Sequence, residues 1–408
     1  MSCYEVKGLL PLEEAMNRLL EKVSLQSSTE QVTLSEASGR ILAVDAISKV
    51  NVPPHHNSSM DGYAIRAADQ DKAPLKLTGQ SFAGHPFVDA VGEGECVRIM
   101  TGAVLPAGAD SVVMQENTDV VDNQLTVTKT VSAGENVRRC GEDIAEGHVV
   151  LTKGRRITTS DVGLLASLGE QKVTVYKAVT AAVFSTGDEL KPPGSVLSDG
   201  EIYESNGVTV ASLLKKMGVN VIEMGIIPDE QDALRTAFEQ ANQQADVVIS
   251  SGGVSVGDAD FVKDILAEKG VVELWKLAIK PGKPFAFGTL SDSYFIGLPG
   301  NPVSALVTLH QLAVPALAKM GGEVLPQRIR IPATLQTRLN KRPGRTDFQR
   351  GIYTFEDGKA VVSKTGNQGS GILSSMSQAN CYIVLPQDSG SVEAGETVTV
   401  ELFDYLLS

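Results

Sequence analysis

The sequence predicts a multidomain protein that combines α/β and all-β parts, built around a three-layer α/β domain with a mostly parallel sheet. From about residue 180 to 328, short β-type runs alternate with helical patterns, as they do when helices cover both faces of a parallel sheet. From about residue 53 to 147 the chain is rich in Gly and short β-type runs. After about residue 329 the alternation stops, and β-type runs separated by Gly and Pro predict a small all-β domain with a barrel-like sheet.

Length and composition are those of a globular protein with several cores. The chain has 408 residues, of which 42% are hydrophobic, and at roughly 100–200 residues per domain it should hold two to four domains. The net charge of −13 argues against a general nucleic-acid surface, which needs a basic face. No Cys-x-x-Cys and no His-Glu-x-x-His occurs, so zinc-knuckle, thioredoxin-like and zinc-protease sites are not supported.

The N-terminus lacks the pattern of a secretory signal. "MSCYEVKGLLPLEEAMNRLL" has no basic start followed by an apolar core and a cleavage site. No apolar run approaches the roughly 20 residues of a membrane span. A cytoplasmic protein without a membrane segment is therefore expected.

Two helices flank the β-rich segment. The first is opened by Pro11, whose missing N–H costs nothing there, and its apolar residues follow helical spacing at Leu12, Ala15, Met16, Leu19, Leu20 and Val23. The pattern breaks at Pro53-Pro54. The second helix lies in "RRITTSDVGLLASLG" and is opened by a Thr/Ser/Asp cap.

The middle domain is predicted as a series of strands and helices. Strands are expected at "TAAVFS", "NVIEMGII", "DVVIS", "PFAFG" and "YFIGL". Helices are expected over about 204–217, around Leu234–Ala241, around Phe261–Leu266 and over "NPVSALVTLHQLAVPALAKM". The C-terminal strands are expected at "RIRIPATLQ", "AVVSKTG", "NCYIVLP" and "TVTVELF".

Glycine-rich loops follow two of these strands. In open α/β sheets, ligands bind beyond the carboxyl ends of the strands. Gly252, Gly253 and Gly257 in "SSGGVSVGDAD" let backbone amides face an anion, and "GLPGNP" repeats the device with Gly300, followed by Asn301 and Pro302 at a helix start. Either loop alone could be a tight strand–helix turn, but two at one sheet edge favour an anion site.

Acidic residues follow at the same edge, namely Glu189, Asp229, Asp258 and Asp260. Mg²⁺ commonly bridges one or two carboxylates to a phosphate, so a magnesium site is one interpretation. Helix capping is the other, since Asp is favoured just before helices. Asp260 lies inside a helix start and is the hardest to explain as a cap.

Lysines stand in the apolar segment "LWKLAIKPGKPFAFG". Their spacing of four would keep Lys276 and Lys280 on one face of an extended strand, where they could receive an oxyanion. A solvated strand edge is the alternative reading. P-loop and dinucleotide-binding motifs do not occur. The residues alone thus predict a phosphate- or oxyanion-handling α/β domain, with Mg²⁺ assisting.

Eight motifs in order resemble one family. These are "NSSMDGYA", "RIMTGAVLP", "GEDI", "STGDEL", "SSGGVSVGDAD", "KPGKP", "GLPGNPVS" and "DFQRG". They are similar to the molybdopterin molybdenumtransferases, the bacterial MoeA and gephyrin E-domain group. The resemblance implies insertion of molybdenum from molybdate into adenylated molybdopterin, with Mg²⁺, releasing AMP and molybdenum cofactor. It also implies a homodimer and contact with other proteins of molybdenum-cofactor biosynthesis.

The resemblance further implies four domains. Residues 1–50 and 147–178 would form a discontinuous elongated linker domain, and residues 51–146 a β-rich module inserted in it. Residues 179–328 would be the molybdopterin-binding α/β domain and residues 329–408 the C-terminal all-β domain.

Site residues are carried over from the same resemblance. The catalytic set would be Asp61, Thr101 and Asp143 from the inserted module, with Glu189, Lys276 and Lys280 from the α/β side. Mg²⁺ would be held by Asp229 and Asp260. The substrate-binding set would be Ser251, Gly252, Gly253, Ser255, Gly300, Asn301 and Pro302, with Arg350 and Ser370 helping to hold molybdate.

Two other functions stay open at this point. A molybdopterin adenylyltransferase would resemble the middle domain alone, and the additional modules favour the insertase. A non-catalytic carrier or scaffold is the other alternative, although several acids without a cation partner would be costly to bury.

Overall fold

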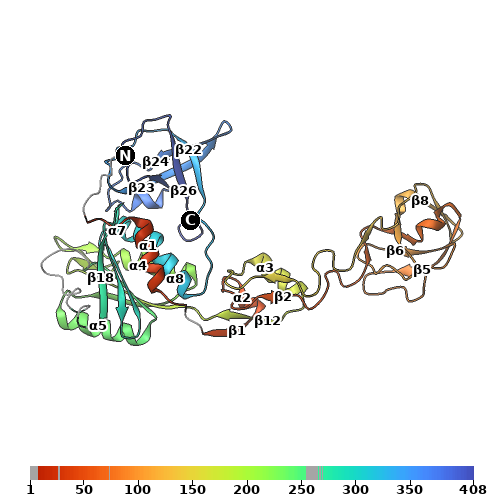
Figure 1. Cartoon of the computed structure of the whole chain (residues 1–408), viewed down its shortest axis with the longest axis horizontal. Coiled ribbons are helices and arrows are strands. Elements are labelled where there is room, and N and C mark those ends of the chain that lie inside the picture. Colours follow the sequence, from red (N-terminus) through yellow and green to blue (C-terminus); the bar gives the residue numbers. More distant parts are fainter. Residues whose placement is uncertain (1–7, 26–27, 73, 254–264, 266–267, 269) are drawn as a thin grey trace.

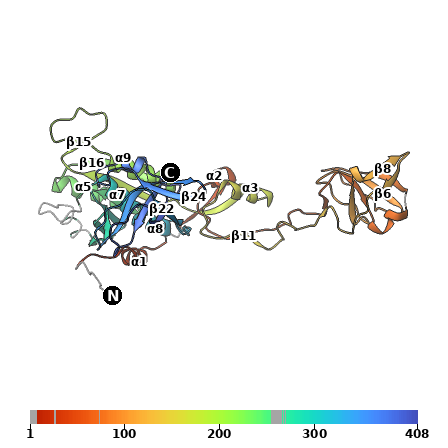
Figure 2. The same ribbon diagram turned by 90° about the horizontal axis from the view of Figure 1, so that it is seen from above.

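The protein is an elongated molecule with a large lobe at one end and a smaller one at the other (Figures 1 and 2). The structure, a computed structural model, describes the chain except residues 1–7, 26–27, 73, 254–264, 266–267 and 269. The large lobe holds the α/β sheet and the C-terminal strands, and the small lobe holds the β-rich module. A narrow connection, through which the chain runs out to the small lobe and back, joins them.

The α/β domain is built on a six-stranded sheet. Its order is β16 (Asn220–Ile227), β13 (Thr180–Thr186), β17 (Val247–Ser251), β21 (Tyr294–Leu298), β20 (Pro284–Leu290) and β18 (Gly270–Lys276). The first four strands are parallel, and β20 and β18 continue the sheet antiparallel. The predicted mostly parallel sheet is confirmed.

Alternation along the central strands explains the three layers. Ala181 and Val183 of β13 face one apolar cluster, while Ala182 and Phe184 face another, because successive side chains of a strand point to opposite faces. The first cluster is covered by α1 (Leu12–Lys22), α4 (Asn206–Met217), α7 (Pro302–Thr308) and α8 (Val314–Met320). The second is covered by α5 (Gln231–Gln244). A short parallel ribbon of β14 (Leu190–Lys191) and β15 (Ile202–Tyr203) follows β13.

The long apolar helix predicted over residues 301–320 forms with one irregular turn. A π-helical turn, Leu309–Ala313, joins α7 to α8. Pro315 follows it and has no N–H to donate into the helix, so the regular ladder cannot continue there. Pro302–Met320 is long and apolar enough to cross a membrane, but 89% of its apolar window is buried inside the protein, as in a core helix.

The connection between the lobes contains two antiparallel strand pairs and two helices. They are β1 (Thr29–Thr33) with β12 (Lys172–Tyr176), β2 (Ala46–Ile47) with β11 (Val149–Leu151), α2 (Leu34–Ala37) and α3 (Thr159–Ser167). The predicted cap of α3 is confirmed, since Thr158 and Asp161 form a reciprocal capping box.

Helix α1 differs from the assignment of residues 1–50 to the linker. Its Ala15 and Leu19 are fully buried in the α/β core, where they lie in the same cluster as α8. Figure 1 shows α1 beside α4 and α8, away from β1. The other domain boundaries stay a prediction.

The β-rich module has a six-stranded sheet with a small ribbon beside it. The sheet order is β7 (Ser111–Met114), β4 (Gly62–Ile65), β6 (Glu95–Ile99), β5 (Leu75–Ser81), β9 (Gln124–Val127) and β8 (Thr118–Val121). The ribbon pairs β3 (Asn57–Ser58) with β10 (Val137–Arg138), and two 3₁₀ turns are Ala67–Lys72 and Gln115–Asn117.

The C-terminal part is a closed five-stranded barrel. Its strands are β22 (Arg330–Leu335), β23 (Thr346–Glu356), β24 (Lys359–Lys364), β25 (Cys381–Leu385) and β26 (Thr397–Leu402), with the short helix α9 (Ser374–Ser377). Pairing of β25 with both β26 and β23 closes the barrel. The longest strand, β23, was not among the predicted ones. A short strand of the preceding domain, β19 (Ile279–Lys280), pairs with the start of β23.

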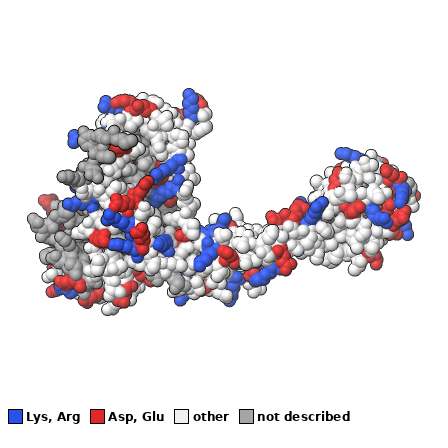
Figure 3. Space-filling view, in the orientation of Figure 1, with Lys and Arg blue, Asp and Glu red and all other residues white. Residues whose placement is uncertain are grey.

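Charged side chains of both signs are interspersed over the face of the molecule drawn in Figure 3. Lysines and arginines alternate with acidic residues on the large lobe, on the connection and on the small lobe. A nucleic-acid surface would instead need a continuous basic face. Among the described residues drawn in this view, the basic side chains do not form such a face.

Candidate active site

One pocket gathers the loops at the carboxyl ends of the parallel strands. It has a volume of about 650 Å³ and opens beyond β13, β17 and β21. The predicted substrate residues Ser251, Gly252, Gly253, Gly300, Asn301 and Pro302 all line it, as does the predicted catalytic Glu189. The remaining lining residues are Ser185, Thr186, Leu190, Ile202, Tyr203, Glu204, Ser205, Asn206, Pro284, Pro299, Ser304 and Gly371.

Gly252 fits its position for two physical reasons. Its φ of 90° lies in the left-handed region, which favours glycine. A Cβ atom at this residue would also stand 2.5 Å from the carbonyl oxygen of Thr186. The same residue approaches the neighbouring loop closely, because a Cβ on Gly300 would lie 4.0 Å from the Gly252 Cα. At Gly252 and Gly300, therefore, backbone without a side chain lines the pocket.

Asn206 holds the two glycine loops together. It stands in the first turn of α4, and its Nδ2 donates to Ser251 Oγ at 2.8 Å and to the Gly300 carbonyl oxygen at 2.7 Å. One amide thus bridges the loop after β17 and the loop after β21. This fixes the spacing between the two loops that would cradle an anion.

Buried polar atoms crowd the pocket floor. Glu204 is 8% exposed and accepts hydrogen bonds from Ser185 Oγ at 2.9 Å and from the Gly207 N–H at 2.6 Å. The hydroxyl oxygen of Thr186, which lines the pocket, is buried and has no partner within the described residues. A buried hydroxyl without a hydrogen-bond partner is costly, so a polar ligand in the pocket would stabilise it by supplying one.

Acidic side chains occupy the rim beyond β13 and β16. Burial raises the pKa of Asp229, and the charges of Asp188 and Glu189 raise it further. The Asp229 N–H donates to Asp188 Oδ1 at 3.3 Å. Like charges held this close favour a cation between them. In the described part of the chain, no three His, Cys, Asp or Glu residues form a ready metal cage.

The start of the long helix adds a further contact to the pocket. Asn301 is the N-cap of α7 and Pro302 is its first residue, as predicted, but the Asn301 side chain makes no capping hydrogen bond. The carbonyl oxygen of Ser370, from the loop before α9, accepts the Val303 N–H at 3.0 Å. The C-terminal barrel therefore reaches the pocket through this loop, and Gly371 lines it.

Arg350 holds the loop before α9 from inside the barrel. It is fully buried in β23, and its guanidinium donates to Ser375 Oγ at 3.0 Å and to the Phe348 and Gly369 carbonyl oxygens at 3.2 Å. Its donors thus point into the protein, toward partners in the same barrel. A direct role for Arg350 stays a prediction.

The prediction of one continuous extended segment for Lys276 and Lys280 is wrong. Lys276 ends β18 in the α/β sheet, opposite the pocket residue Pro284. Lys280 lies in β19, which pairs with the barrel strand β23, and its Nζ donates to Asp347 Oδ2 at 3.2 Å. The backbone changes sheets at the buried residues Leu277 and Ala278, so spacing alone could not place both lysines.

Two of the predicted site residues, Asp61 and Thr101, form a polar pair in the small lobe. Asp61 Oδ1 accepts both the backbone N–H and the hydroxyl of Thr101 at 2.7 Å, and these bonds lower the pKa of Asp61. Asp143 is exposed near the entry to the same lobe. Figures 1 and 2 place this lobe at the far end of the molecule from the α/β pocket, so one chain does not bring the two sets together.

Two predicted site residues, Ser255 and Asp260, lie outside the described residues. In contrast, the segment "IYESNG" at 202–207 was missed in the sequence. It supplies Glu204, Ser205 and Asn206 to the pocket. A polar cluster at the start of a predicted helix, in a domain whose other loops carry the site, was the available signal.

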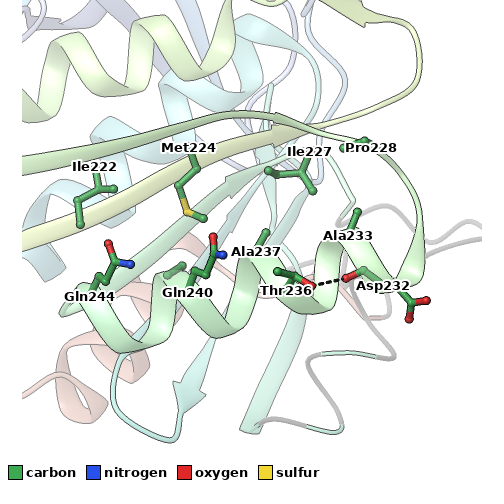
Figure 4. Close-up of a pocket in the computed structure, with 11 residues that line it drawn as sticks. Ile222, Met224, Ile227, Pro228, Asp232, Ala233, Thr236, Ala237, Gln240 and Gln244 are labelled. Carbon is green, nitrogen blue, oxygen red and sulfur yellow. Dashed lines mark hydrogen bonds between the residues drawn. The ribbon is translucent and has the colours of Figure 1, made fainter.

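A second hollow of about 590 Å³ lies between β16 and α5 (Figure 4). Its walls carry Ile222, Met224 and Ile227 from the strand and mostly Ala, Thr and Gln from the helix. The Thr236 hydroxyl donates to the Asp232 carbonyl oxygen within the helix at 2.8 Å. With Asp232 as its only charged lining residue, this groove lacks the chemistry of an oxyanion site.

Comparison with known proteins gives matches along the whole chain. Family models match in order, namely the MoeA N-terminal region (domain I and II) at 10–169, the probable molybdopterin binding domain at 182–319 and the MoeA C-terminal region (domain IV) at 332–403. The molybdopterin molybdenumtransferase of Haemophilus influenzae is 47% identical over 405 residues, covering 98% of this chain and 100% of that protein. Gephyrin of Dictyostelium discoideum is 33% identical, covering 96% of this chain and 62% of gephyrin.

Solved structures agree with this assignment. The crystal structure of a molybdopterin biosynthesis MoeA protein from Pyrococcus horikoshii OT3 matches with a TM-score of 0.83 at 31% identity, covering 97% of this chain and 100% of that one. The chain therefore belongs to the MoeA family of molybdopterin molybdenumtransferases.

Proposed function

We propose that this chain inserts molybdenum from molybdate into the dithiolene of adenylated molybdopterin, with release of AMP. The observation that carries the proposal is the pocket of about 650 Å³ in which glycine loops from β17 and β21 meet. Open backbone in these loops suits a phosphate or another oxyanion. The unpaired hydroxyl of Thr186, which lines this pocket, supports a polar ligand there.

Each predicted residue then has a task. Ser251, Gly252 and Gly253 would bind the pterin phosphate, and Asn206 keeps their loop at a fixed spacing from Gly300. Lys276, at the end of β18, would stabilise negative charge that develops on the pyrophosphate. Glu189 lines the pocket at the acidic rim.

A magnesium ion fits the acidic rim. Asp229 sits among like charges that raise its pKa, and Mg²⁺ typically takes one or two carboxylates plus substrate phosphates and water. Asp229, with Asp260, would hold the ion. When bound, Mg²⁺ neutralises pyrophosphate charge and polarises the linkage that is cleaved.

A homodimer would complete the site. Asp61 and Thr101 lie in the small lobe, far from the pocket of their own chain, so a second chain would have to supply them (Figure 1). Mixing Asp61→Ala with Asp229→Asn protein tests this, because a mixed dimer holds one site with both intact. Recovered activity in the mixture, with sedimentation at twice the chain mass, is expected; two inactive variants that stay inactive together contradict the shared site.

The central test is AMP release from adenylated molybdopterin by the purified protein. Release should require molybdate, and Asp229→Asn should lose it while Asp232→Asn, three residues on and exposed, keeps it. Transfer of AMP from ATP to molybdopterin would instead identify an adenylyltransferase. Substrate binding without any AMP release would identify a carrier.

A further inference from the structure

A second polar pocket, the basic pocket, lies at the seam between the α/β domain and the barrel. It has a volume of about 370 Å³ and shares no lining residue with the active-site pocket. It forms where β19 pairs with the start of β23. Its lining residues are Lys280, Asn340, Lys341, Arg342, Arg345, Asp347 and Ser391.

Positive charge dominates this pocket. Four of its lining residues are cationic and only Asp347 is acidic. The Asp347 carboxylate is 2% exposed, and its Oδ2 already accepts hydrogen bonds from Lys280 Nζ and Gln349 Nε2, both at 3.2 Å. No ion pair within 4 Å joins Arg342 or Arg345 to a carboxylate among the residues that the structure describes. Their two charges are therefore uncompensated in a chain of net charge −13.

Lys341 gives the pocket a built floor. It is 7% exposed, and its ammonium group donates to the carbonyl oxygens of Ser389 at 2.7 Å and Gln387 at 3.3 Å. Burial lowers the pKa of Lys341; Asp347 and Asp388 oppose this shift, while Lys280 and Arg345 add to it. An anion in the pocket would relieve the repulsion between these cations.

We propose that the basic pocket binds a small tetrahedral dianion, the class that includes molybdate, before the dianion enters the active-site pocket. Arginines present paired N–H donors that match oxyanions, and a positively lined cleft raises the local concentration of anions. The volume is about twelve times the roughly 30 Å³ share of one water, so the ion fits with part of its hydration shell.

The chain connects this pocket directly to the catalytic one. Lys280 lines the basic pocket, and Pro284, four residues further, lines the active-site pocket. The Cα atoms of Lys280 and Pro284 are therefore at most roughly 14 Å apart, because an extended chain spans no more than ~3.6 Å per residue. This inference rests on the proposed function, because molybdate is the substrate there.

The kinetic test uses the full-length protein with both arginines neutralised, Arg342→Gln with Arg345→Gln. AMP release is followed against molybdate concentration. We expect the KM for molybdate to rise about tenfold with kcat unchanged, because two partly exposed charge-assisted contacts are lost. Arg338→Gln, which removes an exposed arginine paired with Glu393, is the matched control and should leave KM unchanged. Arg342→Lys with Arg345→Lys keeps the charge but loses the paired N–H donors, so its KM should lie between those of the wild type and the Gln variant.

A second measurement does not depend on activity. Crystals soaked in molybdate should show an anomalous scattering peak between Arg342 and Arg345, which added sulfate displaces and which the Gln variant lacks. If the protein releases no AMP under any condition, the proposed function fails, and the peak alone decides about the pocket. Absence of the peak overturns the proposal. A peak with an unchanged KM, meaning binding at crystal concentration only, overturns it as well.

Discussion

Gly252→Ala is the most direct test of how the pocket is built. The substitution places a Cβ 2.5 Å from the Thr186 carbonyl oxygen and forces a residue with a side chain into φ 90°. The left-handed conformation costs an L-residue about 1–2 kcal/mol. Relief of the contact requires backbone movement, since both atoms are fixed by the sheet, and overpacking of this kind costs another 1–3 kcal/mol or so. We therefore expect a loss of about 2–5 kcal/mol in the free energy of unfolding.

Gly218→Ala separates these two contributions. Gly218 has φ 85° in the same domain, at the end of α4, but a Cβ there meets its nearest atom only at 3.7 Å. It should cost only the conformational part, about 1–2 kcal/mol. Trp275, the single tryptophan, is buried in β18 of the same sheet, so its fluorescence during urea unfolding reports on this domain for both variants.

Activity adds an independent readout. If the Gly252 loop shifts, AMP release by Gly252→Ala should fall by about a hundredfold, because displacements near 1 Å cost that much in positioned reactions. Gly218→Ala should retain its rate. Equal unfolding free energies for the two variants, or a normal rate for Gly252→Ala, would refute the close approach of Gly252 to the Thr186 carbonyl.

Three further outcomes are expected. Asn206→Asp replaces the amide donor with a carboxylate that faces the Gly300 carbonyl oxygen. A loss of about 1–3 kcal/mol of transition-state stabilisation predicts a fall of roughly 5- to 150-fold in kcat/KM for AMP release. An unchanged kcat/KM would exclude the bridging role. Thr101→Val removes the hydroxyl bond to Asp61 and should cost about 0.5–1.5 kcal/mol of transition-state stabilisation, whereas Thr101→Ser should keep it; equal kcat/KM for both variants would contradict this. Glu401→Gln removes the charge that Arg328 and Arg330 share in the buried barrel wall and should destabilise the protein by about 3–5 kcal/mol. Burial raises the pKa of Glu401, but Arg328, Gln311 and Arg330 together bring it below the usual 4.5, so this stabilisation is present above pH 4.5 and is lost as the pH falls through the lower folded-state pKa. Thermal unfolding of the wild type and Glu401→Gln at pH 7 and in acid checks this prediction. If the difference in stability between the two proteins does not become smaller in acid, the prediction is contradicted.

Local patterns were sufficient to predict the α/β sheet and its rim. The β-branched runs at Val247–Ser251 and Tyr294–Leu298 and the glycines after them identify strands and loops by themselves, and parallel topology brings those loops together. Gly252 and Gly300 could therefore be placed in one pocket from the amino-acid sequence alone.

Features that depend on contacts distant in sequence were not predictable in this way. The chain leaves one sheet and joins another at Leu277 and Ala278, two apolar residues with no turn signal, because each is fully buried between the α/β domain and the barrel. The family resemblance marked Arg350 only as a residue that would hold molybdate, and its partners Gly369 and Ser375 lie 19 and 25 residues further on. Asn206 was missed because its two partners lie 45 and 94 residues away.

The attachment of the small lobe has a consequence for how such a protein can change. Val52 and Ile144 exchange backbone hydrogen bonds of 2.8 and 3.1 Å, so the chain leaves for the lobe and returns from it at neighbouring points. Everything between them can be exchanged for another segment with adjacent ends while the remaining strand pairs stay in register. Lineages could thus remodel the small lobe without rebuilding the sheet that carries the glycine loops.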